Sequence, residues 1–315
     1  MDPDKARALY GSHYADLYNG LWEESDTWAP ETRLHVEWLS RCIDPNVRWL
    51  DVGCGTGWIL SQFPDIMRAG IDLSPSMLER ARAANPGALE FRQGDIRDDI
   101  PDWFGSWDLV SSTGHAWCYV SSIDEVETIA ENMARWAAPT GTVFVQPPDL
   151  CDLTGHQLSY DFTGGPPGQG NLAITGVVWS FTDEGGVHEN MIWPSLDVWV
   201  GWYSKWFHRV EVHTWPHEPE FLPCPRKILI ARGKRAPGDM EPAEVYFHPG
   251  PGQPDQEVQV FTSSVTPEPL SQGTNATEPV RLVDRPLSHL IERAAPWRPE
   301  LWRALRHRGR RLLSR

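Results

Sequence analysis

An aspartate and three glycines occupy every second position at the end of the first strongly apolar run of the chain. Residues 48–57 read RWLDVGCGTG, in which Asp51 is followed by Gly53, Gly55 and Gly57. Glycine reaches backbone φ values closed to other residues, and a loop without Cβ atoms lets a ligand lie against the peptide backbone at the start of a helix. The pattern predicts a buried strand that ends in a ligand-binding turn; an ordinary tight strand-to-helix connection is the alternative.

The sixth position counted from Gly53 separates two nucleotide-type ligands. A dinucleotide fingerprint needs glycine there, but the sequence has Trp58, which disfavours a bound pyrophosphate. The alternation Asp51-x-Gly53-x-Gly55-x-Gly57 instead resembles the first motif of class I S-adenosylmethionine-dependent methyltransferases. That resemblance implies that S-adenosyl-L-methionine is the cofactor and that the loop backbone lies against its methionine and ribose parts. It also implies that Asp51 helps to hold the amino group of the cofactor.

Two further acidic residues follow predicted strands. Asp72 lies near the end of the strand predicted for residues 68–73, 19 residues after Gly53, where a carboxylate can accept hydrogen bonds from both ribose hydroxyls. The resemblance implies that Asp95 contacts the adenine amino group and that Ile96 packs on the ring. The complete cofactor site that the resemblance implies is Asp51, Gly53, Cys54, Gly55, Gly57, Asp72, Leu73, Met77, Asp95, Ile96 and Ser112.

The fourth predicted strand, residues 107–112, leads into the segment 113–119, TGHAWCY. Open α/β sheets place their chemistry at this carboxyl end. Methyl transfer from a sulfonium requires in-line positioning, and a hydroxyl acceptor usually also needs a base. His115 is the candidate catalytic residue because an imidazole titrates near neutral pH. With an amine acceptor, His115 would only bind and orient the substrate, and a structural hydrogen-bonded role is the alternative.

The segment 3–24 carries four aromatic residues at every fourth position, which places them on one face of a predicted helical arm. They are Tyr10, Tyr14, Tyr18 and Trp22. In many small-molecule methyltransferases the corresponding segment closes over the active site, so the resemblance makes His13 and Tyr14 lid candidates. Tyr18 and Trp22 are expected to pack onto the core instead.

Residues 171–193 contain two β-rich runs around the sequence DEGG, which is a hairpin signal. The hairpin resembles the substrate cover of methyltransferases that dimethylate amino sugars or methylate related glycosides. Core packing is the prediction for Trp179 and Trp193. Two loop aspartates, Asp149 and Asp152, would be the ligands of a magnesium ion, but no metal site is predicted. The predicted substrate contacts are His13, Tyr14, Trp117, Tyr119, Tyr160 and His188.

Strands and helices alternate after the glycine loop, which predicts an α/β fold with helices on both faces of a parallel sheet. The resemblance specifies a Rossmann-like class I methyltransferase fold with a seven-stranded, mostly parallel sheet, an inserted antiparallel hairpin and a C-terminal extension. It also implies that an antiparallel seventh strand lies between the fifth and the sixth. The predicted strands are 48–52, 68–73, 89–93, 107–112, 142–146, 209–214 and 226–232.

Composition divides the chain into four segments. Residues 1–46 are the helical arm, 47–235 the cofactor-binding core, 236–284 a Pro- and Gly-rich arm or small β element, and 285–315 a basic amphipathic tail. The tail holds nine arginines and two glutamates, a net of +7, whereas the total is −15, so residues 1–284 carry −22. We expect the tail to dock on the acidic body or a partner subunit, or to lie on an anionic membrane surface.

Net charge, the length of apolar runs and cysteine usage exclude several classes of protein. An acidic body disfavours nucleic acid as a partner, because phosphate binding needs clustered Lys and Arg. No apolar run approaches 18 residues and no charged-then-apolar leader is present, so a cytoplasmic location is expected. Five scattered cysteines without a Cys-x-x-Cys pair argue against a disulfide framework or a structural zinc site.

The predicted activity is methylation, from S-adenosyl-L-methionine, of a hydroxyl or amino group on a sugar-containing small molecule or glycan. The resemblance covers residues 1–235 and departs in the Pro-rich loop after the fifth strand. Two alternatives stay open: a methyltransferase of a non-sugar metabolite or lipid, and a catalytically inactive cofactor-binding scaffold. A homodimer is a further partner hypothesis.

Overall fold

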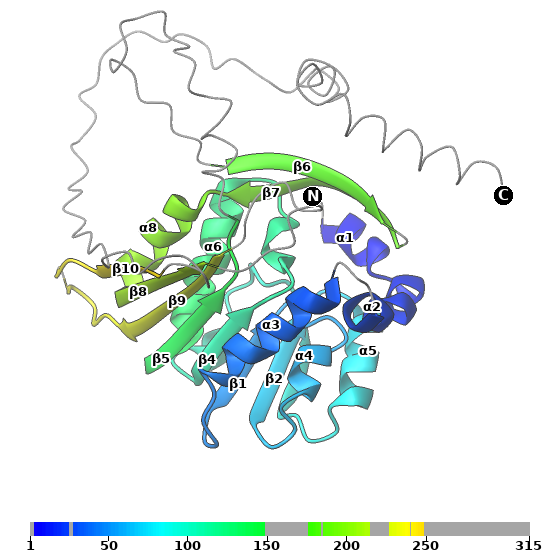
Figure 1. Ribbon diagram of the computed structural model, residues 1–315, viewed down its shortest axis with the longest axis horizontal. Helices are drawn as coiled ribbons and strands as arrows, with labels where there is room; N and C mark the ends of the chain where they lie inside the picture. Colours follow the sequence, from blue (N-terminus) through cyan, green and yellow to red (C-terminus); the bar gives the residue numbers. More distant parts are fainter. Residues whose placement is uncertain are drawn as a thin grey trace, which may run out of the picture. The chain divides into compact units, whose positions relative to one another are not determined.

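The computed structural model describes residues 3–24, 28–148, 176–183, 185–214, 227–239 and 241–248, all within one compact unit of residues 1–264 (Figure 1). Some predictions concern residues outside these ranges and stay predictions. They are the substrate contact Tyr160, the metal alternatives Asp149 and Asp152, and the tail 285–315. Within the described ranges, no helix has the length and apolar character needed to cross a membrane.

An eight-stranded sheet forms the centre of the fold, in the order β10-β8-β9-β5-β4-β1-β2-β3. Its strands are β1 (Arg48–Val52), β2 (Met67–Asp72), β3 (Glu90–Gln93), β4 (Trp107–Ser112), β5 (Ala137–Val145), β8 (Phe207–Thr214), β9 (Lys227–Lys234) and β10 (Glu244–His248). Only β9 in this sheet is antiparallel to its neighbours, and it lies between β5 and β8. The seven predicted strands are therefore confirmed, as is the antiparallel seventh strand between the fifth and the sixth.

The eighth strand, β10, lies within residues 236–284, for which an arm or a small β element was predicted, and it joins the central sheet. Glu244–His248 pairs in parallel with β8, from Glu244 opposite Arg209 to His248 opposite His213. Val245 is buried in the main core, which anchors the strand at the sheet edge.

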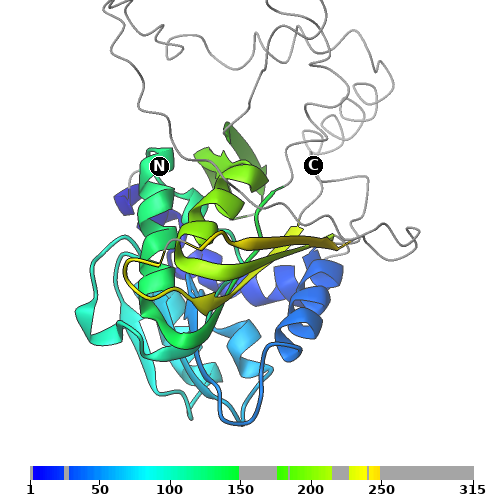
Figure 2. The same ribbon diagram turned by 90° about the vertical axis from the view of Figure 1, so that its left-hand side faces the viewer.

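Helices cover both faces of the sheet. They are α1 (Pro3–Leu9), α2 (Ser12–Glu24), α3 (Trp28–Ser40), α4 (Trp58–Ser61), α5 (Pro75–Ala84), α6 (Ile123–Trp136) and α8 (Leu196–Trp206). Figure 2, viewed from the β10 edge, shows α6 and α3 on opposite sides of the sheet. Neighbouring residues of β1 alternate between the two cores: Leu50 and Val52 pack on the α6 and α8 side, Trp49 on the other.

Local sequence explains where these helices begin. The Ser74 side chain accepts a hydrogen bond from the Met77 amide at 3.2 Å, and Pro75 occupies the first turn of α5. The predicted N-terminal arm is two helices rather than one, because α1 ends at Leu9 and α2 begins at Ser12.

The predicted hairpin is present as a separate two-stranded sheet of β6 (Gly176–Asp183) and β7 (Gly186–Pro194). Its register shifts opposite Ser180, where Asn190 has a φ of 54° and donates its amide hydrogen to the Ser180 hydroxyl at 2.9 Å. This bulge changes the alternation of β7, so His188 and Met191 are both buried although they are three residues apart.

The glycine loop adopts the left-handed conformation at all three glycines, with φ values of 72°, 53° and 67° at Gly53, Gly55 and Gly57. A Cβ atom at Gly57 would lie 2.8 Å from the Asn85 Nδ2 atom and 3.1 Å from the Ala81 Cβ atom. Gly57 therefore lets the loop pack closely against α5.

Substitution Gly57→Ala should lower the free energy of unfolding by about 2 kcal/mol, because it combines a strained φ with a contact against a buried helix. Gly87→Ala is the matched control, since a Cβ at Gly87 meets nothing within 4 Å and its φ is not positive. Urea denaturation of both variants measures the difference. Equal stability of the two variants would contradict this account of the loop.

Candidate active site

A cavity lies at the carboxyl ends of β1, β2 and β3, at the sheet edge where open α/β folds bind ligands. It encloses about 740 Å³, including its open mouth. Among the predicted cofactor residues, those that line it are Gly53, Gly55, Asp72, Leu73, Met77, Asp95 and Ile96. The fold thus brings predicted cofactor residues from three separate strand ends to one cavity.

Asp72 organises the floor of this cavity. Its Oδ2 atom accepts a hydrogen bond from the Gly55 amide at 2.9 Å, and its Oδ1 atom accepts one from the Ser74 amide at 2.8 Å. Burial raises the pKa of the Asp72 carboxyl, and these backbone hydrogen bonds act in the opposite direction. The carboxylate therefore fixes the glycine loop against the tip of β2.

Asp95 has a different environment, because Arg97 forms a two-pronged ion pair with it. The Arg97 Nε and Nη2 atoms donate to the two Asp95 oxygens at 2.9 and 2.6 Å, and Nη1 donates to Glu125 at 2.8 Å. Partial burial acts to raise the pKa of Asp95, but the Arg97 hydrogen bonds and charge outweigh it and hold the pKa below its usual value. Asp95 is therefore an ionised acceptor at the cavity wall.

Asp51 lines a smaller adjoining cavity of about 330 Å³ rather than the large one. Cys54 and Gly53 line it too, together with Tyr18 and Gly114. The Ser111 hydroxyl donates to Asp51 at 2.6 Å. Burial raises the pKa of Asp51 to about 7, although this hydrogen bond lowers it. The carboxyl is thus poised to lose its proton when a cation binds beside it.

A second large cavity of about 590 Å³ lies between the N-terminal arm and the hairpin. It shares four wall residues with the first: Tyr10, Tyr18, Gly114 and Tyr119. The other residues that line it are Tyr14, Trp22, His115, Cys118, Trp179, Phe181, Asp183, His188, Met191 and Trp193. The two cavities therefore adjoin at these four residues.

His115 lines the second cavity, where the sequence places it. Its backbone is left-handed, with φ 56° and ψ 24°, a conformation uncommon outside glycine and found at functional sites. Its ring stacks on Trp193 with the centroids 5.5 Å apart and 23° between the planes. His115 can therefore contact an acceptor held in this cavity.

A continuous chain of hydrogen bonds runs along the second cavity. Tyr10 donates to the Tyr119 hydroxyl at 2.6 Å, and the Tyr119 hydroxyl lies 2.7 Å from His188 Nδ1. His188 Nε2 lies 3.2 Å from Asp183 Oδ2, which also accepts from the Tyr14 hydroxyl at 2.7 Å. Burial raises the pKa of Tyr10, Tyr14 and Tyr119, so all three phenols keep their protons.

Two predicted substrate contacts do not reach either cavity. His13 is exposed on the outer side of α2. Trp117 is fully buried, and its ring packs against Trp199 with the centroids 4.9 Å apart. Both predictions are corrected, because His13 lies about 100° around α2 from Tyr14 and so points away from the cavity, and Trp117 faces the core from a 3₁₀ turn, η2 (Ala116–Cys118).

Two predicted cofactor residues support the loop instead of lining the large cavity. The Ser112 hydroxyl donates to the Val52 carbonyl at 2.9 Å between strands. Gly57 packs against α5, as described above. Trp193 is buried in the main core and Trp179 packs against it, as predicted, and both also line the second cavity.

The sequence reasoning missed Asp183, Arg97 and the cavity-facing role of Tyr10 and Tyr18. The four-residue spacing of the tyrosines did predict their common face, but spacing alone does not tell a ligand-facing helix from a core-facing one. Asp183 lay within the turn signal DEGG. Its Oδ1 atom does hold the turn, accepting from the Gly185 amide at 2.9 Å, while Oδ2 faces the cavity.

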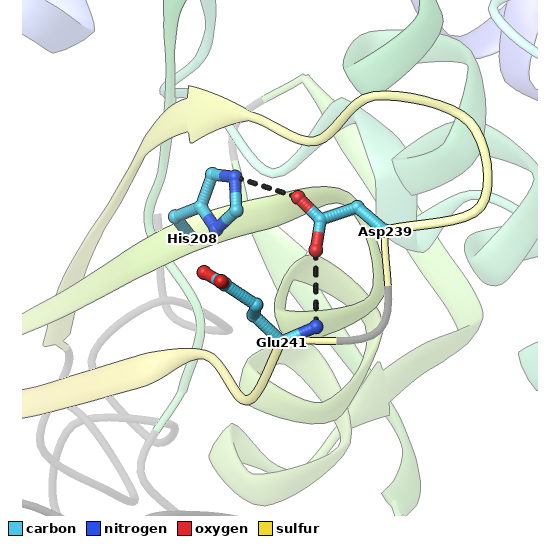
Figure 3. A group of neighbouring side chains, drawn as sticks. All are labelled: His208, Asp239 and Glu241. Atoms are coloured by element: carbon cyan, nitrogen blue, oxygen red, sulfur yellow. Dashed lines mark hydrogen bonds and ion pairs between the residues drawn. The ribbon is translucent and has the colours of Figure 1, made fainter.

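One group of possible metal ligands occurs among the described residues, away from both cavities: His208, Asp239 and Glu241, with ligand atoms within 4.8 Å of one another (Figure 3). Asp239 already accepts from the Glu241 amide at 3.0 Å and pairs with His208 at 3.0 Å. These contacts explain the group as the support of the turn that leads into β10.

Comparison with known proteins identifies relatives of part of this chain. Residues 50–141 match the family described as "Methyltransferase domain". The chain is 30% identical over 144 residues to dTDP-4-amino-2,3,4,6-tetradeoxy-D-glucose N,N-dimethyltransferase of Saccharopolyspora spinosa, covering 44% of this chain and 56% of the relative. It is 35% identical over 137 residues to trans-aconitate 2-methyltransferase of Acidovorax sp. (strain JS42), covering 40% and 48%. The chain thus spans about half the length of the curated relatives it matches.

Solved structures with a similar course of the chain include DesVI of Streptomyces venezuelae, at 19% identity and a TM-score of 0.46, covering 70% of this chain and 98% of that one. A complex of DhpI with SAH (S-adenosylhomocysteine) has 17% identity and a TM-score of 0.49, covering 74% and 98%.

The affinity for S-adenosylhomocysteine should rise roughly tenfold between pH 6 and pH 8. The folded-state pKa of Asp51 is raised to about 7, so the carboxyl is protonated below that pH and must ionise to pair with the ammonium group of the ligand. Calorimetric titration in buffers of different ionisation enthalpy measures both the affinity and the released proton.

Asp51→Asn should bind more weakly, with an affinity that no longer changes over this range. Glu79→Gln on the exposed side of α5 is the control and should keep the pH dependence of the wild type. A pH-dependent affinity that persists in Asp51→Asn would show that another group titrates.

Proposed function

We propose that this chain, whose residues 50–141 match a methyltransferase domain family, transfers the methyl group of S-adenosyl-L-methionine to a hydroxyl or amino group of a sugar-containing small molecule. The observation that carries the proposal is the pair of cavities with one common wall. The cofactor fits the cavity between the glycine loop, Asp72 and Asp95, and the acceptor fits the second cavity. Transfer needs the two reacting groups held in line at short distance, which two adjoining cavities provide.

The residues of the second cavity favour an acceptor whose reacting end is neutral or cationic. No Lys or Arg is found among the described residues that line it, whereas Asp183 contributes a carboxylate. A tricarboxylate such as the trans-aconitate of some relatives would bury its negative charges there without a partner, which is costly. An amine or a hydroxyl can instead donate to Asp183, His188 or the tyrosines.

Aromatic side chains support a sugar-containing acceptor. Tyr14, Trp179, Phe181 and Trp193 offer flat apolar faces that suit the C–H face of a sugar ring, and they attract a cationic amine. The curated relative whose name specifies an amino sugar nucleotide agrees with this chemistry. A non-sugar metabolite or lipid with an equivalent amine or hydroxyl is the second candidate.

The test is a methyl-transfer assay with isotope-labelled S-adenosyl-L-methionine and three acceptors: dTDP-4-amino-2,3,4,6-tetradeoxy-D-glucose, its 4-hydroxy counterpart and trans-aconitate. We expect transfer to one of the two sugar nucleotides and none to trans-aconitate. Transfer to trans-aconitate alone would overturn the acceptor class. Tight binding of S-adenosylhomocysteine without any transfer would favour the scaffold alternative, and absence of binding would overturn the cofactor assignment.

Trp179→Leu should raise the KM for the sugar acceptor about tenfold, a loss of about 1.4 kcal/mol, because it removes an aromatic face from the acceptor cavity. Affinity for S-adenosylhomocysteine should stay unchanged, since Trp179 does not line the cofactor cavity. Phe104→Leu, at a partly exposed site that lines neither cavity, is the control. An unchanged KM in Trp179→Leu would contradict the assignment of the hairpin to acceptor binding.

A further inference from the structure

The hydrogen-bond chain in the second cavity has a defined direction. Tyr10 donates to Tyr119, so the Tyr119 hydroxyl is free to donate its own hydrogen to His188 Nδ1. A His188 ring that accepts at Nδ1 carries its proton at Nε2, which faces the Asp183 carboxylate at 3.2 Å. All four groups are then satisfied with His188 neutral and Asp183 ionised.

The chain begins at the wall that the two cavities share. Tyr10 and Tyr119 line both cavities, whereas His188 and Asp183 line only the acceptor cavity. An acceptor whose reacting group points at the cofactor methyl therefore lies beside the first two members of the chain. A base beyond them can take a proton without occupying the space of the acceptor.

We propose that His188 is the proton acceptor of the reaction and that Tyr119 conducts the proton to it, an inference that rests on the proposed methyl transfer. The acceptor O–H or N–H bond breaks, and its proton passes to the Tyr119 oxygen as the Tyr119 proton passes to His188 Nδ1. The freed lone pair of the acceptor bonds to the methyl carbon, and the electrons of the carbon–sulfur bond return to sulfur. The products are the methylated acceptor, S-adenosylhomocysteine and an imidazolium paired with Asp183.

The surroundings of His188 suit this role. The titratable groups that face it among the described residues are the phenols of Tyr10, Tyr14 and Tyr119 and the Asp183 carboxylate. Burial lowers the pKa of His188, whereas the Asp183 charge raises it, and the net pKa lies below the usual value. His188 therefore stands in its neutral, proton-accepting form near pH 7, beside a carboxylate that stabilises the charged form once it arises.

The hairpin is built to hold this ring in place. Phe181 stacks on the His188 ring with the centroids 4.2 Å apart and 5° between the planes. Asp183 Oδ1 accepts from the Gly185 and Gly186 amides at 2.9 and 3.1 Å, which fixes the carboxylate. A hydroxyl, an imidazole and an orienting carboxylate, here Tyr119, His188 and Asp183, form the arrangement that activates hydroxyl groups in other enzymes. His115, the base predicted from the sequence, also lines this cavity and then orients the acceptor.

A first experiment needs no acceptor. Nitrogen-15 NMR of histidine in the full chain bound to S-adenosylhomocysteine should show His188 as the Nε2–H tautomer. Tyr119→Phe should raise its pKa, because the hydrogen bond to the neutral ring is lost, and Asp183→Asn should lower it, because the charge that stabilises the imidazolium is lost. The Nδ1–H tautomer, or a His188 pKa that neither variant moves, would overturn the relay.

A second experiment follows kcat against pH with whichever of the two sugar nucleotides accepts the methyl group. We expect the acidic limb to follow the His188 pKa measured by NMR and to move to lower pH with it in Asp183→Asn. His188→Gln should lose about 100-fold in kcat while it keeps its affinity for S-adenosylhomocysteine, which also reports correct folding. His115→Gln should turn over more slowly but keep the acidic limb.

Either of two results would overturn the proposal. One is a pH profile of kcat whose acidic limb disappears in His115→Gln, and the other is a His188→Gln variant with the kcat of the wild type. A wild-type protein that binds S-adenosylhomocysteine but methylates none of the three acceptors contradicts the proposed function instead. In that case the tautomer and the pKa shifts still decide whether the relay exists.

Discussion

The hydrogen bonds of the Asp72 carboxylate join the parts on which the rest of the site depends. Asp72 holds the Gly55 amide of the glycine loop and the Ser74 amide at the start of α5. The Ser74 hydroxyl in turn donates to the Tyr10 carbonyl, and the Tyr10 hydroxyl donates to Tyr119. The tip of β2 is therefore connected through polar contacts to the loop after β1, to the N-terminal arm and to the wall between the cavities.

The electrostatics of the cofactor site favour a cation. Burial raises the pKa of both Asp51 and Asp72, and the charge of Asp72 adds to the shift of Asp51, because two carboxylates near each other resist ionising together. Asp95 ionises more readily than these two carboxyl groups, because Arg97 forms an ion pair with it. A ligand with an ammonium and a sulfonium group supplies positive charge beside Asp51 and Asp72, so part of its affinity comes from relief of the repulsion between these two carboxylates.

Sequence predicted the cofactor half of the site far better than the acceptor half, and the reason is the range of the interactions. Asp51, the loop glycines and Asp72 act within or next to single strand ends, so their types and spacing report their positions. Trp117 and Tyr119 lie two residues apart on one short turn, yet one is buried in the core and the other lines both cavities. That outcome depends on α8 and the hairpin, which local patterns do not place.

Two other features could not be predicted from local sequence patterns, for the same reason. A regular β7 would place His188 and Met191 on opposite faces, and only the bulge at Asn190 brings both toward the second cavity. The short run Glu244–His248 has the composition of a strand, but nothing in it specifies β8 as its partner. Register shifts and edge pairing are settled by the packing of distant segments, so a one-dimensional pattern predicts the element without its neighbour.

The acceptor cavity exists only because the arm and the hairpin pack against each other. A Cβ atom at Gly185 would lie 1.8 Å from the Tyr14 ring, and Tyr14 donates to Asp183, so the turn of the hairpin closes directly onto α2. Figure 1 shows the hairpin reaching across to α1. Tyr10 and Tyr18 of the same arm also line the cofactor cavity, so one helical arm forms part of the wall of both binding sites. By linkage, any effect of one ligand on the affinity for the other must be reciprocal.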